Sequence, residues 1–311
     1  MPADSSDAVD HVLPCPDLDG TLAFFTGRLG FRLDMITPAD DPAVAVVSGH
    51  GVRMRLERTG GSSAADEEWR VGRAGMRYRD LLPDRGPFIA SHILIPEGGP
   101  VPDYVHHHKV RFQTLYCVAG WARLVYEDQG PPFLFAAGDC VLQPPGIRHR
   151  VLESSAGLEV VEVTSPAEHE TLVDHDLELP TATVDSARSF GGQRFVHHRS
   201  AAAQWQPWRA PGFECRETGI GAATGGLAEV RVIRPRRAPA HGAAFGGHDG
   251  EFVFWFVVAG ATEARIGTGD PTPLGRGDAV TVPARKEHAL TGWSDDLEIL
   301  EITLPAVIAW G

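Results

Sequence analysis

A repeated segment constrains the fold of this 311-residue chain more than any other feature. The stretch Leu158-Glu-Val-Val-Glu-Val-Thr-Ser-Pro-Ala167 matches Leu297-Glu-Ile-Leu-Glu-Ile-Thr-Leu-Pro-Ala306 at an offset of 139 residues. Three more pairs share this offset: Gly138 with Gly277, Pro144 with Pro283, and His149 with His288. Because self-similarity at a fixed period marks copies of one structural unit, the sequence predicts two tandem domains of the same fold.

The repeated domains have the composition of β-sheet. Runs such as Phe252-Val-Phe-Trp-Phe-Val-Val258 and Ala279-Val-Thr-Val282 are rich in β-branched and aromatic residues. Gly and Pro punctuate these runs, as expected at the turns between strands. We therefore expect a mainly β protein with two β-barrels.

The first copy contains a candidate metal site. His106 and His108 are one residue apart, and strand side chains alternate with period two, so both lie on one face of a strand. Gln113 and His149 then supply a third and a fourth potential ligand from neighbouring strands. Three imidazoles and one amide oxygen suit a divalent first-row transition metal.

The spacing of these residues resembles the two sequence motifs of the cupin superfamily. The matching positions are Gly99, His106, His108, Gly120, Gly138, Pro144, Gly146 and His149. Gln113 departs from the pattern, because most cupins carry Glu there. The resemblance implies two tandem double-stranded β-helix (jelly-roll) barrels, as in bicupins such as quercetin dioxygenases and pirin-like proteins. We place barrel 1 at residues 73–180, a linker at 181–200 and barrel 2 at 201–311.

The second copy has lost part of the ligand set. Gly246 stands at the position of His106, and Val253 at the position of Gln113. The remaining histidines define a possible vestigial second site: His241, His248 and His288. A degenerate barrel that buttresses the first is the favoured interpretation.

Residues 1–58 have a different pattern, with one predicted strand, one helix and three further strands. Asp17 or Asp19 is expected to cap the helix, and Gly30 to end it. This βαβββ order, with the run Phe24-Phe-Thr-Gly-Arg-Leu-Gly-Phe-Arg32, resembles one module of the vicinal-oxygen-chelate superfamily (glyoxalase I, extradiol dioxygenases). His11 matches a ligand position of that family, but Arg55 matches the other, and an arginine repels a cation. No metal is expected in this module.

A lone βαβββ module leaves an open sheet edge, which invites pairing with another chain. We therefore expect a homodimer; the alternative is that the module folds against its own barrels. A polar linker is predicted at residues 59–72.

Charge and composition limit the partners. The net charge of -13 argues against nucleic acid and anionic membranes as partners. No apolar run approaches the roughly 18 residues of a membrane span, and the N-terminus lacks the basic start of a signal peptide. The four cysteines show no Cys-x-x-Cys pairing. We expect a cytoplasmic protein that acts on a small molecule.

The ligand set favours particular chemistry. Neutral ligands leave the charge of the metal uncompensated, which favours anionic, bidentate ligands such as enolates, catecholates or hydroxy-acids. Around the site, Tyr104, Arg111 and Arg148 are candidate substrate or acid–base residues. Glu159 and Glu162, repeated as Glu298 and Glu301, are three apart and face opposite sides of a strand; we expect them to serve the barrel rather than the chemistry.

Three functions follow in order of preference. The first is dioxygenation of a small anionic or polyhydroxylated metabolite with iron; Zn, Ni, Mn and Cu also suit the ligands. The second is metal-dependent isomerase or lyase chemistry without a redox step, of the kind in uronate-opening cupins. The third is small-molecule binding or a pirin-like interaction without catalysis.

Overall fold

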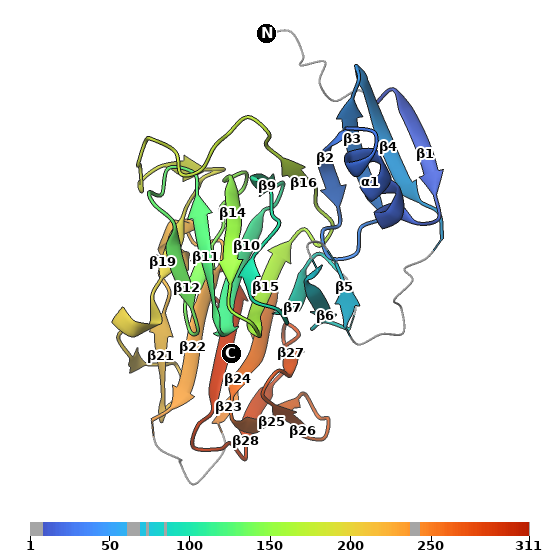
Figure 1. Cartoon of the computed structure of the whole chain (residues 1–311). Coiled ribbons are helices and arrows are strands. Elements are labelled where there is room, and N and C mark those ends of the chain that lie inside the picture. The colour runs from blue at the N-terminus through green and yellow to red at the C-terminus, as the bar shows by residue number, and fades with distance from the viewer. Residues whose placement is uncertain (1–8, 61–68, 73–74, 84–85, 237–242, 311) are drawn as a thin grey trace.

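The structure, a computed structural model, describes residues 9–60, 69–72, 75–83, 86–236 and 243–310. It consists of an N-terminal module and two β-barrels (Figure 1). The predicted fold class is confirmed: the chain is mainly β, with two tandem jelly-roll barrels. In the described part of the chain, neither helix is long and apolar enough to span a membrane.

The N-terminal module has the predicted βαβββ order: β1 (His11–Cys15), α1 (Leu18–Gly27), β2 (Arg32–Thr37), β3 (Val44–Gly49) and β4 (Val52–Arg58). Asp17 caps the helix, because its side chain accepts a hydrogen bond of 2.9 Å from the backbone N–H of Gly20. Leu18 and Phe25 are buried in the core beneath the helix. Gly30 takes a φ of 71°, which lets the chain turn into β2.

Barrel 1 is made of two sheets. One has the order β19-β13-β10-β15-β7-β6-β5. Its strands are β5 (Arg70–Val71), β6 (Arg77–Asp80), β7 (Ile89–Ile95), β10 (Phe112–Ala119), β13 (Cys140–Leu142), β15 (Leu158–Ser165) and β19 (Val196–His198). The other has the order β16-β9-β14-β11-β12, with β8 beside β14. Its strands are β8 (Gly99–Pro100), β9 (His106–His108), β11 (Trp121–Tyr126), β12 (Phe133–Ala136), β14 (His149–Ser154) and β16 (Thr171–Val173).

Two predicted linkers contain strands. The segment 181–200 holds a short hairpin of β17 (Ser189–Phe190) and β18 (Gln193–Arg194), followed by β19, which pairs with β13 of barrel 1. The end of the segment 59–72 holds β5, which pairs with β6. Strands β5 and β19 therefore belong to a sheet of the first barrel, although the sequence predicted linkers at their positions.

Barrel 2 also has two sheets, of orders β20-β21-β22-β29-β24-β27 and β23-β28-β25-β26. After the 3₁₀ turn Ser200–Ala202, its elements are β20 (Gln206–Pro207), β21 (Phe213–Glu217), α2 (Ile220–Ala223), β22 (Glu229–Pro235), β23 (Ala243–Phe245), β24 (Phe252–Ala259), β25 (Ala261–Ile266), β26 (Thr272–Gly275), β27 (Ala279–Thr281), β28 (His288–Thr291) and β29 (Glu298–Leu304).

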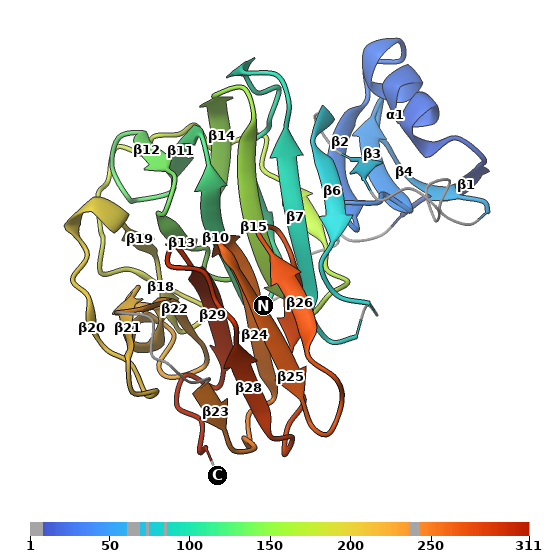
Figure 2. The same cartoon turned by 90° about the horizontal axis from the view of Figure 1, so that it is seen from below.

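The two barrels share an apolar core between their facing sheets (Figure 2). Alternate side chains of strand β24 pack into two different cores. Phe252, Phe254 and Phe256 point into the shared core, while Trp255 points into barrel 2. Phe252 stacks on Phe88 of barrel 1 with ring centroids 4.3 Å apart. Because both faces are buried, such strands are continuously apolar.

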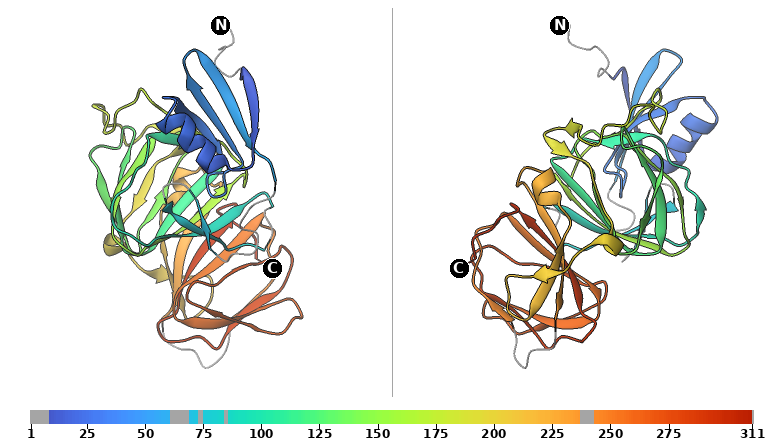
Figure 3. Two further views of the ribbon diagram at one scale, coloured as in Figure 1. Left: turned by 45° about the vertical axis from the view of Figure 1, so that its right-hand side comes forward. Right: turned by 90° about the vertical axis from the view of Figure 1, so that its left-hand side faces the viewer.

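The N-terminal module continues a sheet of barrel 1. Strand β16 pairs with β2 on one side and with the histidine strand β9 on the other. Figure 3 shows the module beside barrel 1 and away from barrel 2. The edge at β2, which was expected to invite a second chain, is thus covered by the module's own barrel. The other edge of the module's sheet is β1, which ends the sheet in the described part of the chain, and the homodimer stays a prediction.

Phe254→Ala should reduce the free energy of unfolding by about 3–5 kcal/mol, because it opens a cavity in the shared core. The control is Val307→Ala, at a side chain that is 85% exposed, with an expected change within about 0.5 kcal/mol. Urea unfolding followed by fluorescence measures both. A loss below 1 kcal/mol for Phe254→Ala would contradict tight packing between the barrels.

Candidate metal centre

Three buried histidines of barrel 1 converge on one point. One ring nitrogen from each of His106, His108 and His149 lies within 4.8 Å of the others. The strands explain this arrangement. His106 and His108 share a face of β9, and His149 of β14 stands directly opposite His106 in the pairing of the two strands. Among the described residues this is the one group of His, Cys, Asp or Glu that is arranged to hold a metal ion.

The Nδ1 atom of each of these histidines is held by a neighbour. His106 Nδ1 lies 2.8 Å from the carbonyl of Tyr104, and His149 Nδ1 lies 3.0 Å from the carbonyl of Ile147. A carbonyl only accepts, so both rings carry a proton on Nδ1. His108 Nδ1 lies 2.9 Å from the hydroxyl of Thr171, which is able to accept in the same way. In metal-binding histidines one ring nitrogen typically makes such a contact and the other binds the metal.

Gln113 is fully buried beside the histidines, as predicted, and lines the same cavity. Its amide nitrogen donates a hydrogen bond of 2.5 Å to the carboxylate of Glu162. This contact orients the amide through its nitrogen, and the amide oxygen takes no part in it. The role of Gln113 as a fourth ligand stays a prediction.

Glu162 is a candidate functional residue that sequence reasoning set aside. Glu162 and Glu159 face opposite sides of β15, as expected. Glu162 faces the interior of barrel 1, where it lines the cavity next to the histidines. Burial raises the pKa of its carboxyl, the hydrogen bond from Gln113 acts in the opposite direction, and the nearby Asp40 adds to the rise. A carboxyl of raised pKa beside a candidate metal centre is suited to proton transfer.

The histidines open into a cavity of about 130 Å³. Its walls are mainly apolar and include Ile93, Leu115, Leu124, Phe135, Val151 and Leu158. A cavity of about 150 Å³ holds a molecule such as benzene, so this one has room for a ligand of about one small ring. His169 also lies in the wall, with its ring centroid 5.4 Å from that of His108.

The structure places none of Tyr104, Arg111 and Arg148 among the residues that line the cavity. Tyr104 is 51% exposed at the surface. Arg111 forms a two-pronged ion pair, at 2.8 and 3.0 Å, with Glu251 of barrel 2. That contact ties the two barrels together.

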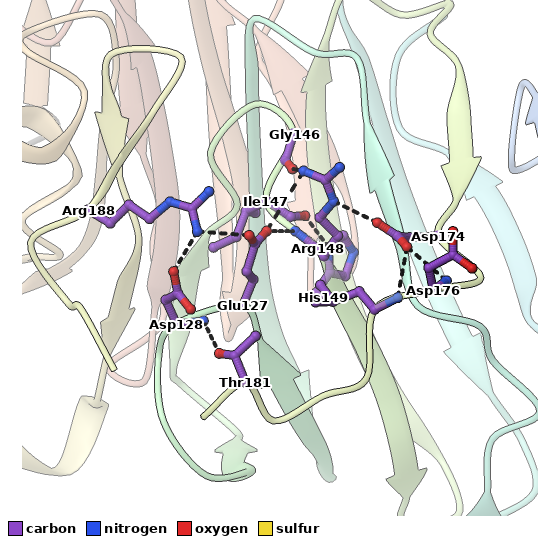
Figure 4. A network of polar contacts seen from close by, with 11 residues as sticks. Glu127, Asp128, Gly146, Ile147, Arg148, His149, Asp174, Asp176, Thr181 and Arg188 are labelled. Atoms are coloured by element: carbon purple, nitrogen blue, oxygen red, sulfur yellow. Dashed lines mark hydrogen bonds and ion pairs between the residues drawn. The ribbon is translucent and has the colours of Figure 1, made fainter. Parts of the chain in front are cut away.

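Arg148 belongs to a polar network on the outer side of His149 (Figure 4). Its guanidinium bonds to Asp174 at 3.0 Å and to the carbonyl of Gly146 at 3.3 Å, while its backbone N–H donates to Glu127. Arg188 completes the network by bonding to Glu127 at 2.8 Å. Arg148 thus fixes the segment before His149 and the segment after β16, which is a positioning role.

The described residues of barrel 2 do not reproduce the metal site. The ring nitrogens of His248 are both used, one 2.9 Å from the carbonyl of Val282 and the other accepting from the N–H of Gly250. His288 stacks on Phe245, and burial lowers its pKa to about 4. His241 lies outside the described residues.

A salt bridge and aromatic rings fill the interior of barrel 2. Glu301, the counterpart of Glu162, accepts two bonds from Arg209, at 2.7 and 2.6 Å, and one from Trp255 at 2.9 Å. Burial opposes ionisation of Glu301, but Arg209 outweighs it, and the net effect is a lowered pKa. The guanidinium of Arg209 lies 3.9 Å from the ring of Trp208 and 3.8 Å from that of Trp310. This packing supports the interpretation of barrel 2 as a structural buttress.

In the N-terminal module, His11 and Arg55 stand at the positions matched to metal ligands of the vicinal-oxygen-chelate family. Neither belongs to a described group of side chains that could hold a metal ion. His11 is exposed on β1, and Arg55 pairs with Glu57 at 2.5 Å. The described residues of this module provide no metal site.

Comparisons with known proteins agree with this fold. No protein-family model matches the sequence, and no curated protein sequence matches it. A salicylate 1,2-dioxygenase from Pseudaminobacter salicylatoxidans superposes with a TM-score of 0.53 and 16% identity, covering 70% of each chain. An oxalate decarboxylase variant from Bacillus subtilis gives a TM-score of 0.54 and 16% identity, covering 81% of this chain and 80% of that one. Likeness at this identity shows a common fold.

Thr171→Val should lower the affinity of barrel 1 for zinc by about 10- to 100-fold, because His108 loses the partner of its Nδ1 atom. Thr171→Ser keeps the hydroxyl and should stay close to wild type. Competition with a chromophoric zinc chelator measures both. Equal affinity in Thr171→Val and wild type would show that other contacts orient His108.

Proposed function

We propose that barrel 1 is the active site of a metal-dependent enzyme, in which His106, His108 and His149 hold a divalent metal and Gln113 supplies a fourth ligand. The observation that carries the proposal is the convergence of three histidines whose Nδ1 atoms are already occupied. Neutral imidazole donors fit Fe, Mn, Ni, Cu or Zn, and iron is our first choice. When bound, the metal would supply Lewis-acid polarisation and, if it is iron, access to dioxygen chemistry.

The first candidate reaction is dioxygenation of a small anionic or polyhydroxylated substrate. The apolar wall of the cavity accommodates the carbon skeleton of such a molecule and excludes bulk water around it. The carboxylate of Glu162 is placed to accept the proton that a hydroxyl group of the substrate loses on binding. The oxygen–hydrogen bond of the substrate breaks and one forms on Glu162.

The same glutamate favours a second candidate, an isomerase or lyase reaction without a redox step. Such a reaction requires one group that removes a proton and returns it at another atom. Glu162 lies in the cavity wall with Gln113 and Thr164 bonded to its Oε1 atom, which holds the carboxylate in place. Binding without catalysis is the third possibility, and the two experiments below separate it from the other two.

Protein purified without chelators or an affinity tag should contain about one equivalent of metal by elemental analysis, and the double variant His106→Ala/His149→Ala should contain none. His107→Ala is the matched control, because His107 lies between the two histidines of β9 but outside the cavity lining. Iron would favour the oxygenase reaction; zinc, nickel or manganese would favour the isomerase. Absence of metal from wild type even after reconstitution would refute the proposal.

Glu162→Gln should retain the metal but lose about 10²- to 10⁴-fold in turnover, because the amide does not take up a proton. Oxygen uptake with catechols and enolisable diketones, and anaerobic conversion of unsaturated uronates, provide the two activity screens. Glu159→Gln is the control, since it makes the same change on the opposite face of β15, where Glu159 bonds to His92 and Arg276. Unchanged turnover in Glu162→Gln would refute its role in proton transfer.

A further inference from the structure

The N-terminal module supplies part of the cavity wall in barrel 1. The connection between β2 and β3 places Ala39 and Asp40 among the residues that line the cavity. Just before it, the hydroxyl of Thr37 donates a 2.8 Å bond to the carbonyl of His169, another lining residue. The pairing of β2 with β16 holds the connection in this position. The module is therefore built into the site by backbone pairing and by side-chain contact.

Asp40 is held firmly at the wall. It is 7% exposed, and its carboxylate lies 3.4 Å from the guanidinium of Arg70. Arg70 in turn bonds to Asp80 of β6 at 2.6 Å. Asp40 lines the cavity, whereas its partner Arg70 does not. The neighbouring Asp41 pairs instead with Arg58, at 2.7 Å, and does not line the cavity.

Apart from its histidines, the described wall carries charged groups of one sign only. Asp40 and Glu162 are its carboxyl side chains, and no Lys or Arg occurs among the described residues that line it. Arg111 and Arg148, the arginines expected to bind a substrate carboxylate, are paired with acids elsewhere. A carboxylate placed against the apolar wall would find no cationic side chain there, and an unpaired charge in such surroundings is costly.

We propose that the N-terminal module closes the active site of barrel 1 and that Asp40 makes it selective for uncharged, hydroxylated ligands over ligands that carry a carboxylate. The proposal rests on the metal-dependent function and narrows its substrate class. When a chelating diol loses its two hydroxyl protons, one to Glu162 and one to solvent, its oxygens match the charge of a divalent metal held by neutral ligands. A further carboxylate on the same ligand meets the carboxylate of Asp40 and no Lys or Arg among the described residues of the wall, and is repelled.

The test uses zinc-loaded full-length protein, because zinc has no redox chemistry and leaves the diols unchanged. Isothermal titration calorimetry gives the dissociation constants of catechol, 2,3-dihydroxybenzoate and 3,4-dihydroxybenzoate. The two acids add a carboxylate at different places on the same ring. Wild type should prefer catechol by about tenfold or more, and Asp40→Asn should reduce that preference by about 3- to 10-fold, because one negative charge is removed near the ligand.

Asp41→Asn is the matched control, since it removes the adjacent charge outside the cavity, and its preference should equal that of wild type. The preference is a ratio of two dissociation constants of the same protein, so a reduced fraction of folded variant affects both constants equally and cancels. Asp40→Ser is a second variant that removes the same charge. If all three ligands bind and Asp40→Asn keeps the wild-type ratio, or if wild type prefers the acids, this inference is overturned and the metal site stands. If no ligand binds the zinc-loaded protein, the metal-dependent function fails, and the inference with it.

Discussion

The pairing of β16 with both β2 and β9 is the interaction on which the functional half of the molecule depends. Thr171 stands opposite His108 in β9 and opposite Ile36 in β2. Its hydroxyl also bonds to the ring of His108. One buried residue thus joins the N-terminal module, the first barrel and the candidate metal centre. A displacement of β2 would be transmitted through two backbone pairings to a histidine of the site.

The two barrels show how one scaffold becomes either a site or a support. Both carry a carboxylate at the same place, Glu162 in the first barrel and Glu301 in the second. Glu162 accepts a hydrogen bond from the neutral amide of Gln113, and burial raises its pKa. Glu301 is met by the cation Arg209, whose guanidinium packs between tryptophan rings. The first arrangement keeps a reactive group in a cavity, and the second fills the cavity with a closed ion pair.

Sequence patterns predicted the features that local geometry determines. The duplication, the alternation of strands and the convergence of His106, His108 and His149 all follow from spacing along the chain, because strand parity and the repeat fix which residues share a face. The helix cap at Asp17 is equally local. The βαβββ order of the module was also predictable, although its family remains a resemblance.

The rest depended on contacts between distant segments. Strand β15 is buried on both faces, against the cavity and against barrel 2, so its apolar pattern does not reveal which face holds Glu162. Arg111 finds its partner 140 residues away, and Arg148 finds Asp174 in the segment after β16. Proximity to a ligand in sequence says little about where a long guanidinium side chain ends. The strand β19 was missed because its pairing with β13 is set by the barrel and its own segment is short and polar.

These contacts also explain why an apolar cavity and a set of neutral ligands occur together. In the proposed metal site, Gln113 is a neutral ligand at the position where the cupin pattern has glutamate, so a bound substrate oxygen would have to supply the missing negative charge. In an apolar enclosure with effective dielectric well below that of water, this attraction is strong, and so is the repulsion of any surplus anion. The arginines that would have relieved such repulsion are used to hold the barrels and loops in place. The proposed selectivity of the site therefore follows from which charges the fold has already paired.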